Sequence, residues 1–135
     1  MKSDIAGETV ALESSANYND YLGSFCAVAN GGNGTLSAGY RMKNGFNVLL
    51  ARDVMDGRWH HFALVYDDAT YEFRLYVDHE LKDTQVMPEA YRPGDGFSDI
   101  WFASGGKLNR SSFEGWIDEV RMTRKALSPE QFMNV

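Results

Sequence analysis

The chain has 135 residues, which is the size of one compact domain, since such domains mostly have about 100–150 residues. Hydrophobic residues make up 44% of it and charged residues 24%, a composition typical of folded globular proteins that excludes global disorder. The formal net charge of −6 has the wrong sign for neutralising phosphates, so we expect no nucleic-acid partner.

The ends and apolar runs of the chain indicate no targeting or membrane segment. Residues 1–20 contain no apolar run after a basic start, and no stretch approaches the ~20 apolar residues of a membrane span. We therefore expect no membrane contact, and the compartment stays open between a cytoplasmic protein and a part of a secreted parent. The single cysteine, Cys26, lies in an apolar run and is predicted to be a buried, unreactive thiol.

Alternation of apolar and polar residues predicts β-strands along the chain. The clearest strand is Tyr71–Asp78, whose odd positions are apolar, and Asp78-His79 predicts a tight turn into a strand that begins at Glu80. Residues Trp59–Asp67 are apolar on both faces, so this strand is predicted to be central and covered on both sides. Further strands are predicted at Thr9–Glu13, Leu22–Ala29, Thr35–Met42, Phe46–Ala51, Asp99–Ser104 and Phe113–Thr123.

Many short strands with turn residues between them predict a sandwich or a barrel. Within the last strand the apolar parity slips between Ile117 and Val120, which predicts a β-bulge near Asp118 and Glu119. Ser128-Pro129-Glu130-Gln131 forms a capping box and predicts a helix of one or two turns that closes one end of the sandwich.

Four segments in order resemble the laminin-G-like domains of the concanavalin A-like lectin/glucanase superfamily. They are Asp56–Asp67 (DGRWHHFALVYD), Leu75–Asp78 (LYVD), Phe113–Met122 (FEGWIDEVRM) and Ala126–Gln131 (ALSPEQ). The resemblance implies an all-β fold, an antiparallel two-sheet jelly-roll sandwich with a short C-terminal helix, as a single domain over residues 1–135. It also implies that His60 lies in a packed strand, and that the protein belongs with domains that are often secreted or displayed on the cell surface.

The chain departs from the family pattern in two places. His79 occupies the hairpin-turn position that usually holds glycine, and histidine tolerates a positive φ better than a β-branched residue does. The first 55 residues also show fewer strands than the family opens with, so the N-terminal half has either diverged or been shortened. A shortened sandwich would expose a sheet edge and favour pairing with a second copy, which makes a homo-oligomer one of the expected partners.

Because the superfamily includes glucanases, catalysis is a hypothesis to weigh. Retaining glycoside hydrolysis needs two carboxylates ~5–5.5 Å apart. On the strand face that holds Glu114 and Asp118, Val120 stands where the glucanase pattern has its third acid. We therefore expect no enzyme, and a glycoside hydrolase relative remains only a remote alternative.

Other polar residues in these segments have simpler interpretations. Asp118 and Glu119 are expected to hydrogen-bond loop backbone or to pair with Arg121 or Arg124. Adjacent residues on a strand point to opposite faces, so His60 and His61 cannot both bind one metal, and His60 is expected to be a hydrogen-bonded core histidine.

The leading functional hypothesis is a carbohydrate- or glycan-binding module. Sugar sites combine an exposed aromatic ring with hydrogen-bonding side chains, and Tyr91 with Arg92, Asp95 and Asp99 provides a ring, a forked donor and acceptors. Trp101 is a further candidate for this site. The aromatic residues Tyr18, Tyr21 and Tyr40 also lie in or beside predicted loops, whereas Trp59 and Trp116 are expected in the core.

Calcium is a candidate ligand, because it prefers loop carboxylates and carbonyls. Asp67 and Asp68 follow a predicted strand, and Asp95 or Asp99 from another loop would complete such a site. The alternative function is a protein–protein interaction or assembly domain that completes its sheet with a second chain.

Overall fold

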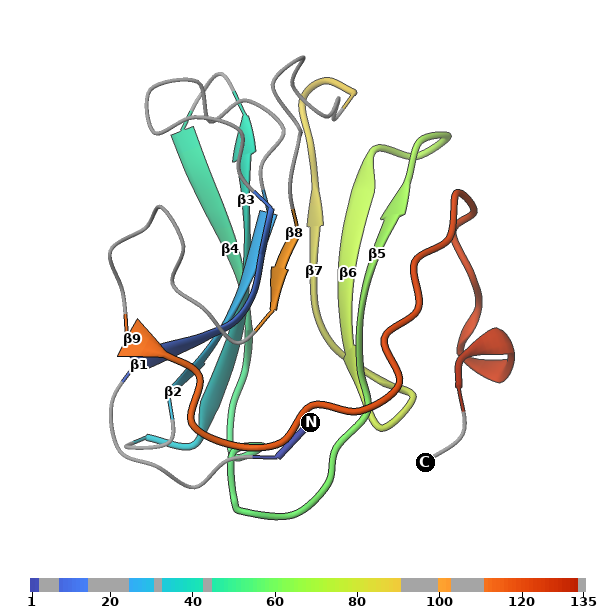
Figure 1. Ribbon diagram of the computed structural model, residues 1–135. Helices are drawn as coiled ribbons and strands as arrows, with labels where there is room; N and C mark the ends of the chain where they lie inside the picture. Colours follow the sequence, from blue (N-terminus) through green and yellow to red (C-terminus); the bar gives the residue numbers. More distant parts are fainter. Residues whose placement is uncertain are drawn as a thin grey trace.

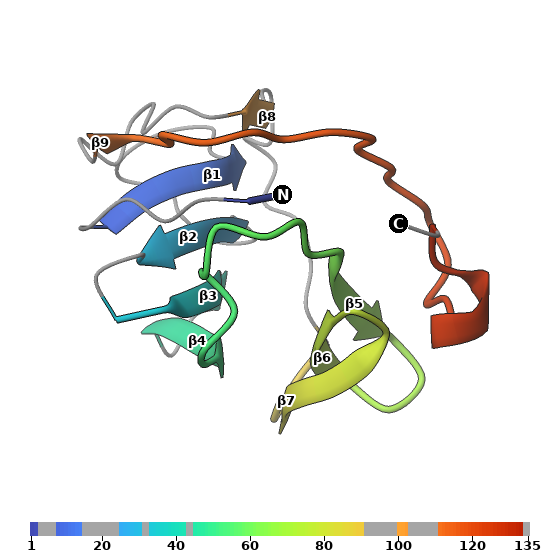
Figure 2. The same cartoon turned by 90° about the horizontal axis from the view of Figure 1, so that it is seen from below.

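Two β-sheets face each other in the computed structural model, which describes residues 1–2, 8–14, 25–30, 33–42, 45–90, 100–102 and 111–133 (Figures 1 and 2). The larger sheet has the strand order β4-β3-β2-β1-β8, and β9 pairs with β1 in parallel. The smaller, antiparallel sheet has the order β5-β6-β7. The larger sheet consists of β1 (Glu8–Ser14), β2 (Phe25–Asn30), β3 (Thr35–Met42), β4 (Gly45–Ala51), β8 (Ile100–Phe102) and β9 (Ser111–Ser112). The smaller sheet consists of β5 (Phe62–Asp67), β6 (Glu72–Val77) and β7 (Glu80–Val86).

The two-sheet, nearly all-β architecture confirms the predicted fold class. Each of the four strands predicted before residue 55 is present, as β1 to β4, with the bounds of β3 as predicted. Whether the N-terminal half is shortened stays a prediction.

Cys26 lies in β2, and its side chain is outside the part of the structure that is described. The described residues include no helix long and apolar enough to cross a membrane.

The core lies between the sheets and is centred on two stacked aromatic rings. Tyr40 on β3 and Phe73 on β6 have ring centroids 3.8 Å apart and nearly parallel planes. Tyr40 is 0% exposed, and its hydroxyl donates a hydrogen bond to Gln85 Oε1 at 3.0 Å. Tyr40 is therefore a core residue, as expected for most single aromatic residues of this chain, and it is not available for ligand contact. The side chains packed around this pair include Leu36, Leu49, Leu75 and Val77.

The two sheets join at one edge through a side chain. The backbone N of Leu50 on β4 donates to Asp83 Oδ2 on β7 at 2.9 Å. β7 in turn follows β6 through the predicted tight turn, in which Asp78 and His79 have φ of 49° and 68°. The hairpin is confirmed, and His79 does adopt the positive φ that its position demands.

Among the described strands, β5 lies at an edge of its sheet, although its sequence predicts a central strand. Its even residues face the core, where Phe62, Leu64 and Tyr66 pack. Its other face is covered by the C-terminal segment, because Val65 packs in a cluster with Tyr76 and Phe132. The apolar character of both faces therefore reflects coverage by irregular chain, which sequence alternation cannot distinguish from a central strand.

The C-terminal segment, residues 113–133, differs most from its prediction. Its first part forms no strand; it makes a single antiparallel bridge, between Trp116 and Lys2. Glu119 has a φ of 45°, which is not extended backbone, so a strand cannot run unbroken through this segment. The predicted strand at Phe113–Thr123, and with it the β-bulge, is wrong. In Figure 1 this orange-to-red segment passes from β9 beneath the core and then up beside β5.

The predicted helical turn is present as a 3₁₀ helix, Pro129–Gln131. The Gln131 side chain reaches back as expected, since its Oε1 accepts a hydrogen bond from Ser128 N at 3.1 Å. Phe132 and Leu127 pack this turn against the outer face of the smaller sheet. The turn thus covers a face of the sandwich and does not close one end of it.

Candidate functional site

The residues predicted to bind sugar fall mostly outside the described structure. Tyr91, Arg92, Asp95 and Asp99 lie in the undescribed range 91–99. Trp101 is described by its backbone alone, in β8, where it pairs with Glu13 of β1. This loop group therefore stays a prediction.

The predicted calcium ligands lie where β5 ends, and both have protein partners. Asp67 accepts hydrogen bonds from Arg74 at 2.9 Å and from the Ala69 backbone at 3.0 Å. Asp68 Oδ1 accepts one from the Tyr66 hydroxyl at 3.2 Å. No group of three or more metal-ligating side chains occurs among the described residues, and the additional ligands proposed from sequence lie in the range 91–99. The calcium site stays a prediction.

Two tryptophans expected in the core are on the surface. Trp59 is 43% exposed and Trp116 is 61% exposed. Trp59 lies before β5 begins, and Trp116 lies in the irregular C-terminal segment, so neither ring is inserted between the sheets. The core prediction is wrong for both residues.

Lys2 lies between these two indoles. Its Nζ is 4.5 Å from the ring centroid of Trp116 and 5.7 Å from that of Trp59, both within the range of cation–π contacts. We call Lys2, Trp59 and Trp116 the tryptophan surface. It combines two partly exposed indole side chains with one ammonium group.

Residues 1 and 2 hold the tryptophan surface together from the backbone. Met1 N donates to His60 O at 2.8 Å, and His60 N donates to Met1 O at 2.9 Å. On the other side, Lys2 N donates to Trp116 O at 3.0 Å and Trp116 N donates to Lys2 O at 3.1 Å. The Met1 side chain is buried in the core. Two segments far apart in sequence, around Trp59 and around Trp116, are thereby fixed side by side.

His60 supports the same region by joining two carboxylates. Its Nδ1 is 2.6 Å from Asp78 Oδ2 and its Nε2 is 2.9 Å from Asp56 Oδ1. Burial lowers the pKa of His60, but the hydrogen bonds to Asp78 and Asp56 outweigh it, and the net shift is upward. Asp56 also accepts a hydrogen bond from Arg58 N at 2.9 Å, which fixes the turn before Trp59. The prediction of a hydrogen-bonded histidine is confirmed, and its side chain is 13% exposed. The implied place in a packed strand is wrong, because β5 begins only at Phe62.

Glu114 and Asp118, the two acids of the glucanase comparison, do not share a strand face, because their segment is not a strand. Asp118 Oδ1 accepts a hydrogen bond from Glu119 N at 2.9 Å, which confirms its predicted role in binding loop backbone. Arg121 donates to the carbonyl of Gln131 at 2.6 Å. Among the described residues, no ion pair joins Glu119 to Arg121 or Arg124.

The tryptophan surface was missed by reasoning from sequence, although a local signal exists. Trp59 follows the turn residues Asp56-Gly57 closely, and Trp116 directly follows Gly115. Turn residues place the chain at the surface, and a large aromatic residue there is a candidate for ligand contact.

Comparisons with known proteins agree with the fold. The family model described as the concanavalin A-like lectin/glucanases superfamily matches residues 3–132. The solved structure of the CBM40 module of Ruminococcus gnavus IT-sialidase is similar with a TM-score of 0.74 at 16% identity, over 96% of this chain and 73% of that one. The same module bound to alpha2,3 sialyllactose gives the same values. Its structure bound to alpha2,6 sialyllactose has a TM-score of 0.58 at 14% identity, over 75% of this chain and 58% of that one.

No curated protein matches the chain significantly. At these identities the solved structures establish the fold alone, whereas the family model spans nearly the whole chain. The protein is therefore a laminin-G-like member of the concanavalin A-like lectin/glucanase superfamily.

Proposed function

We propose that the protein is a non-catalytic carbohydrate-binding module whose ligand stacks on the tryptophan surface. The observation that carries this proposal is the exposure of Trp59 and Trp116 on either side of the Lys2 ammonium group. Single exposed apolar residues are common, whereas two large aromatic residues held close together make a larger apolar patch, the kind of surface that marks an interaction site.

A saccharide matches this platform chemically. A pyranose ring has an apolar face of C–H groups that packs on an indole, while its hydroxyls need hydrogen-bonding partners. Lys2 supplies three N–H donors directly beside the rings. Because the backbone bonds of residues 1 and 2 hold both segments in place, little ordering is needed on binding.

The ligand class that we propose is an acidic glycan, with sialylated oligosaccharides first. The similar modules of Ruminococcus gnavus are described as bound to sialyllactose, a saccharide that carries a carboxylate. Lys2 provides a cation for that carboxylate in the tryptophan surface. Because the overall net charge is −6, selectivity for an acidic ligand would have to come from such a local cation.

Titration calorimetry with sialyllactose and with lactose tests the proposal. Trp59→Ala and Trp116→Ala are each expected to weaken binding at least roughly tenfold, the scale of one lost aromatic contact. Lys2→Met should weaken sialyllactose binding more than lactose binding. Tyr71→Asn changes an exposed aromatic residue in the turn between β5 and β6 and is the control, which should bind as the wild type does. That turn lies at the end of the smaller sheet away from the N-terminus (Figure 1).

The same titration decides between this surface and the loop group predicted from sequence. If Tyr91→Ala and Arg92→Ala abolish binding while both tryptophan variants bind normally, the ligand lies at the loop and our assignment is wrong.

Absence of catalysis is tested separately, by incubating the purified protein with polysaccharides and measuring reducing ends. Release of sugar would contradict the non-catalytic proposal.

A second candidate function is an assembly domain that completes its sheet with a second chain, which the edge position of β5 among the described strands favours. β5 pairs only with β6 among the described strands, so its other edge is without a ladder partner there. Such edges recruit further strands. Light scattering at micromolar concentration tests it, and a monomeric mass would remove this candidate.

A further inference from the structure

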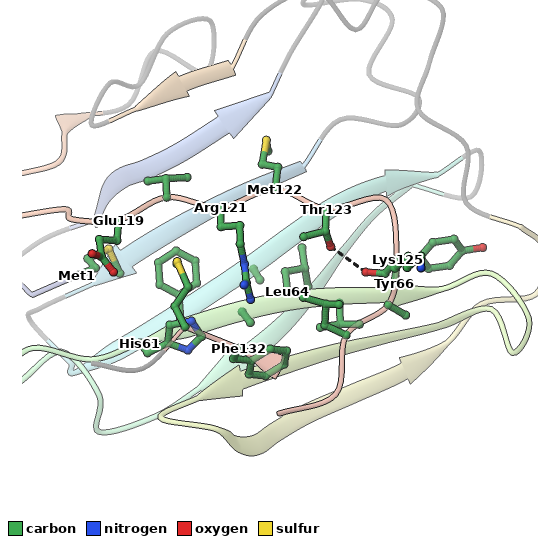
Figure 3. Close-up of a pocket in the computed structure, with 18 of the residues that line it drawn as sticks. Met1, His61, Leu64, Tyr66, Glu119, Arg121, Met122, Thr123, Lys125 and Phe132 are labelled. Atoms are coloured by element: carbon green, nitrogen blue, oxygen red, sulfur yellow. Dashed lines mark hydrogen bonds between the residues drawn. The ribbon is translucent and has the colours of Figure 1, made fainter. Parts of the chain in front are cut away.

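A cavity lies between β5 and the C-terminal segment, away from the indole rings of the tryptophan surface. Its volume is about 570 Å³, within the range of about 300–1,000 Å³ that is typical of small-molecule sites. One wall is β5 and the other is the chain from Ile117 to Leu127, with Phe132 at its base (Figure 3). Most of the lining is apolar, including Leu64, Val65 and Phe132.

His61 is one of the residues that line this cavity, and one of its ring nitrogens has no hydrogen-bond partner. Its Nδ1 is buried without a hydrogen-bond partner, and no hydrogen bond of its other ring nitrogen is found with the described residues. A buried polar group without a partner costs about 1–3 kcal/mol and calls for a specific explanation. Burial, together with the charges of His79 and Arg121, lowers the pKa of His61, so the ring is neutral at pH 7 with one N–H to donate.

Arg121 places a cation at the same point of the cavity. Figure 3 shows its side chain directed from the C-terminal segment into the space above His61 and Phe132. One guanidinium nitrogen donates to the Gln131 carbonyl at 2.6 Å, which orients the group. A guanidinium has five N–H donors in a planar fork, so others remain for a ligand.

The arrangement therefore has an apolar body and one polar end. Leu127 and Phe132, which pack in one cluster, supply the apolar surface, whereas Arg121 and His61 supply a cation and a neutral donor close together. A carboxylate accepts hydrogen bonds from both kinds of donor and is the usual partner of an arginine fork. A neutral apolar molecule would leave the polar end unsatisfied.

We propose that this cavity binds a small amphipathic monocarboxylate, with the carboxylate between Arg121 and His61 and the apolar body against Leu127 and Phe132. This site is separate from the tryptophan surface and does not depend on carbohydrate binding. Its ligand is recognised by one negative charge and a hydrocarbon body and not by hydroxyl groups.

Calorimetry with 4-phenylbutyrate and with the neutral analogue 4-phenyl-1-butanol tests the proposal on the full chain. The acid is expected to bind at least roughly tenfold more tightly than the alcohol, because a charge-assisted hydrogen bond favours it. Arg121→Leu and His61→Phe should each bring the two affinities towards equality. Arg52→Leu removes an exposed cation elsewhere and should leave the ratio unchanged.

Several outcomes would overturn the proposal. These are equal affinities of acid and alcohol for the wild type, absence of binding at millimolar concentration, or an unchanged ratio in Arg121→Leu. If His61→Phe does not fold, Arg121→Leu and the acid-to-alcohol ratio still decide. Amide chemical-shift changes on adding 4-phenylbutyrate must map to β5 and residues 117–132; changes confined to other strands would also contradict the assignment.

Discussion

Gly115 lies directly against Lys2: a Cβ at position 115 would be 2.3 Å from the Lys2 carbonyl oxygen and 2.7 Å from the Phe113 ring. This contact lets the backbone of Trp116 reach the backbone of Lys2 and form the one bridge between them. The position of Trp116, and so the tryptophan surface, depends on the absence of a side chain at residue 115.

Gly115→Ala should therefore separate Trp116 from Lys2. Two backbone hydrogen bonds are lost or displaced, and we expect a loss of stability of about 1–3 kcal/mol, the usual scale of overpacking. Urea unfolding measures the loss, and sialyllactose binding should weaken in parallel. Val120→Ala, an exposed change in the same segment, should stay within about 0.5 kcal/mol; wild-type stability for Gly115→Ala would contradict the packing described here.

His60 makes part of the stability depend on pH. Its pKa is raised in the folded protein, so its ion pairs with Asp78 and Asp56 contribute fully below the ordinary value of about 6.5 and are lost as pH rises through the folded pKa. We expect the difference in unfolding free energy between wild type and His60→Gln to be larger at pH 6 than at pH 9. Urea titrations at both pH values measure it, and a difference that grows with pH would show that the sign is wrong.

Tyr40 gives a second pH dependence, at alkaline pH. Burial, aided by the negative charge of Asp83, raises the pKa of Tyr40 to about 12. Between pH 10 and that value the unfolded chain ionises at this position while the folded protein does not, so stability decreases by up to about 1.4 kcal/mol per pH unit. Tyr40→Phe should lack this part of the alkaline decrease.

The same variant has a cost at neutral pH. Tyr40→Phe removes the hydrogen bond to Gln85, and we expect a loss of about 0.5–1.5 kcal/mol at pH 7. The unfolding free energies of the two proteins should therefore converge above pH 10 and cross before about pH 12, because the alkaline decrease of about 2 kcal/mol exceeds the loss at neutral pH. Parallel pH profiles would mean that Tyr40 ionises equally in both states.

Phe132 anchors the end of the C-terminal segment. Its ring lies 5.2 Å from that of Tyr76 and 5.6 Å from that of His61, between centroids, in a buried cluster with Val65. Phe132→Ala should cost about 3 kcal/mol and speed hydrogen exchange of the Val65 amide. Met122→Ala, which changes an exposed side chain of the segment, serves as the control; equal effects of both variants would mean that the segment is not anchored at Phe132.

Local patterns determined much of the fold. Alternation over Thr35–Met42 located β3, and Asp78-His79 marked the hairpin between β6 and β7. The capping box at Ser128 marked the helical turn. These features depend on backbone preferences and on the facing of neighbouring side chains, both of which a sequence records directly.

What covers each strand was decided only by the tertiary structure. β5 reads as a central strand because its outer face is covered, but the cover is Phe132 and irregular chain. Trp59 and Trp116 read as core residues, yet both are exposed, and two backbone pairings with residues 1 and 2 bring them together. The Arg121–His61 end of the cavity likewise joins positions 60 residues apart. Periodicity reports that a face is buried and not which distant segment buries it, so the candidate sites could not be read from the sequence by itself.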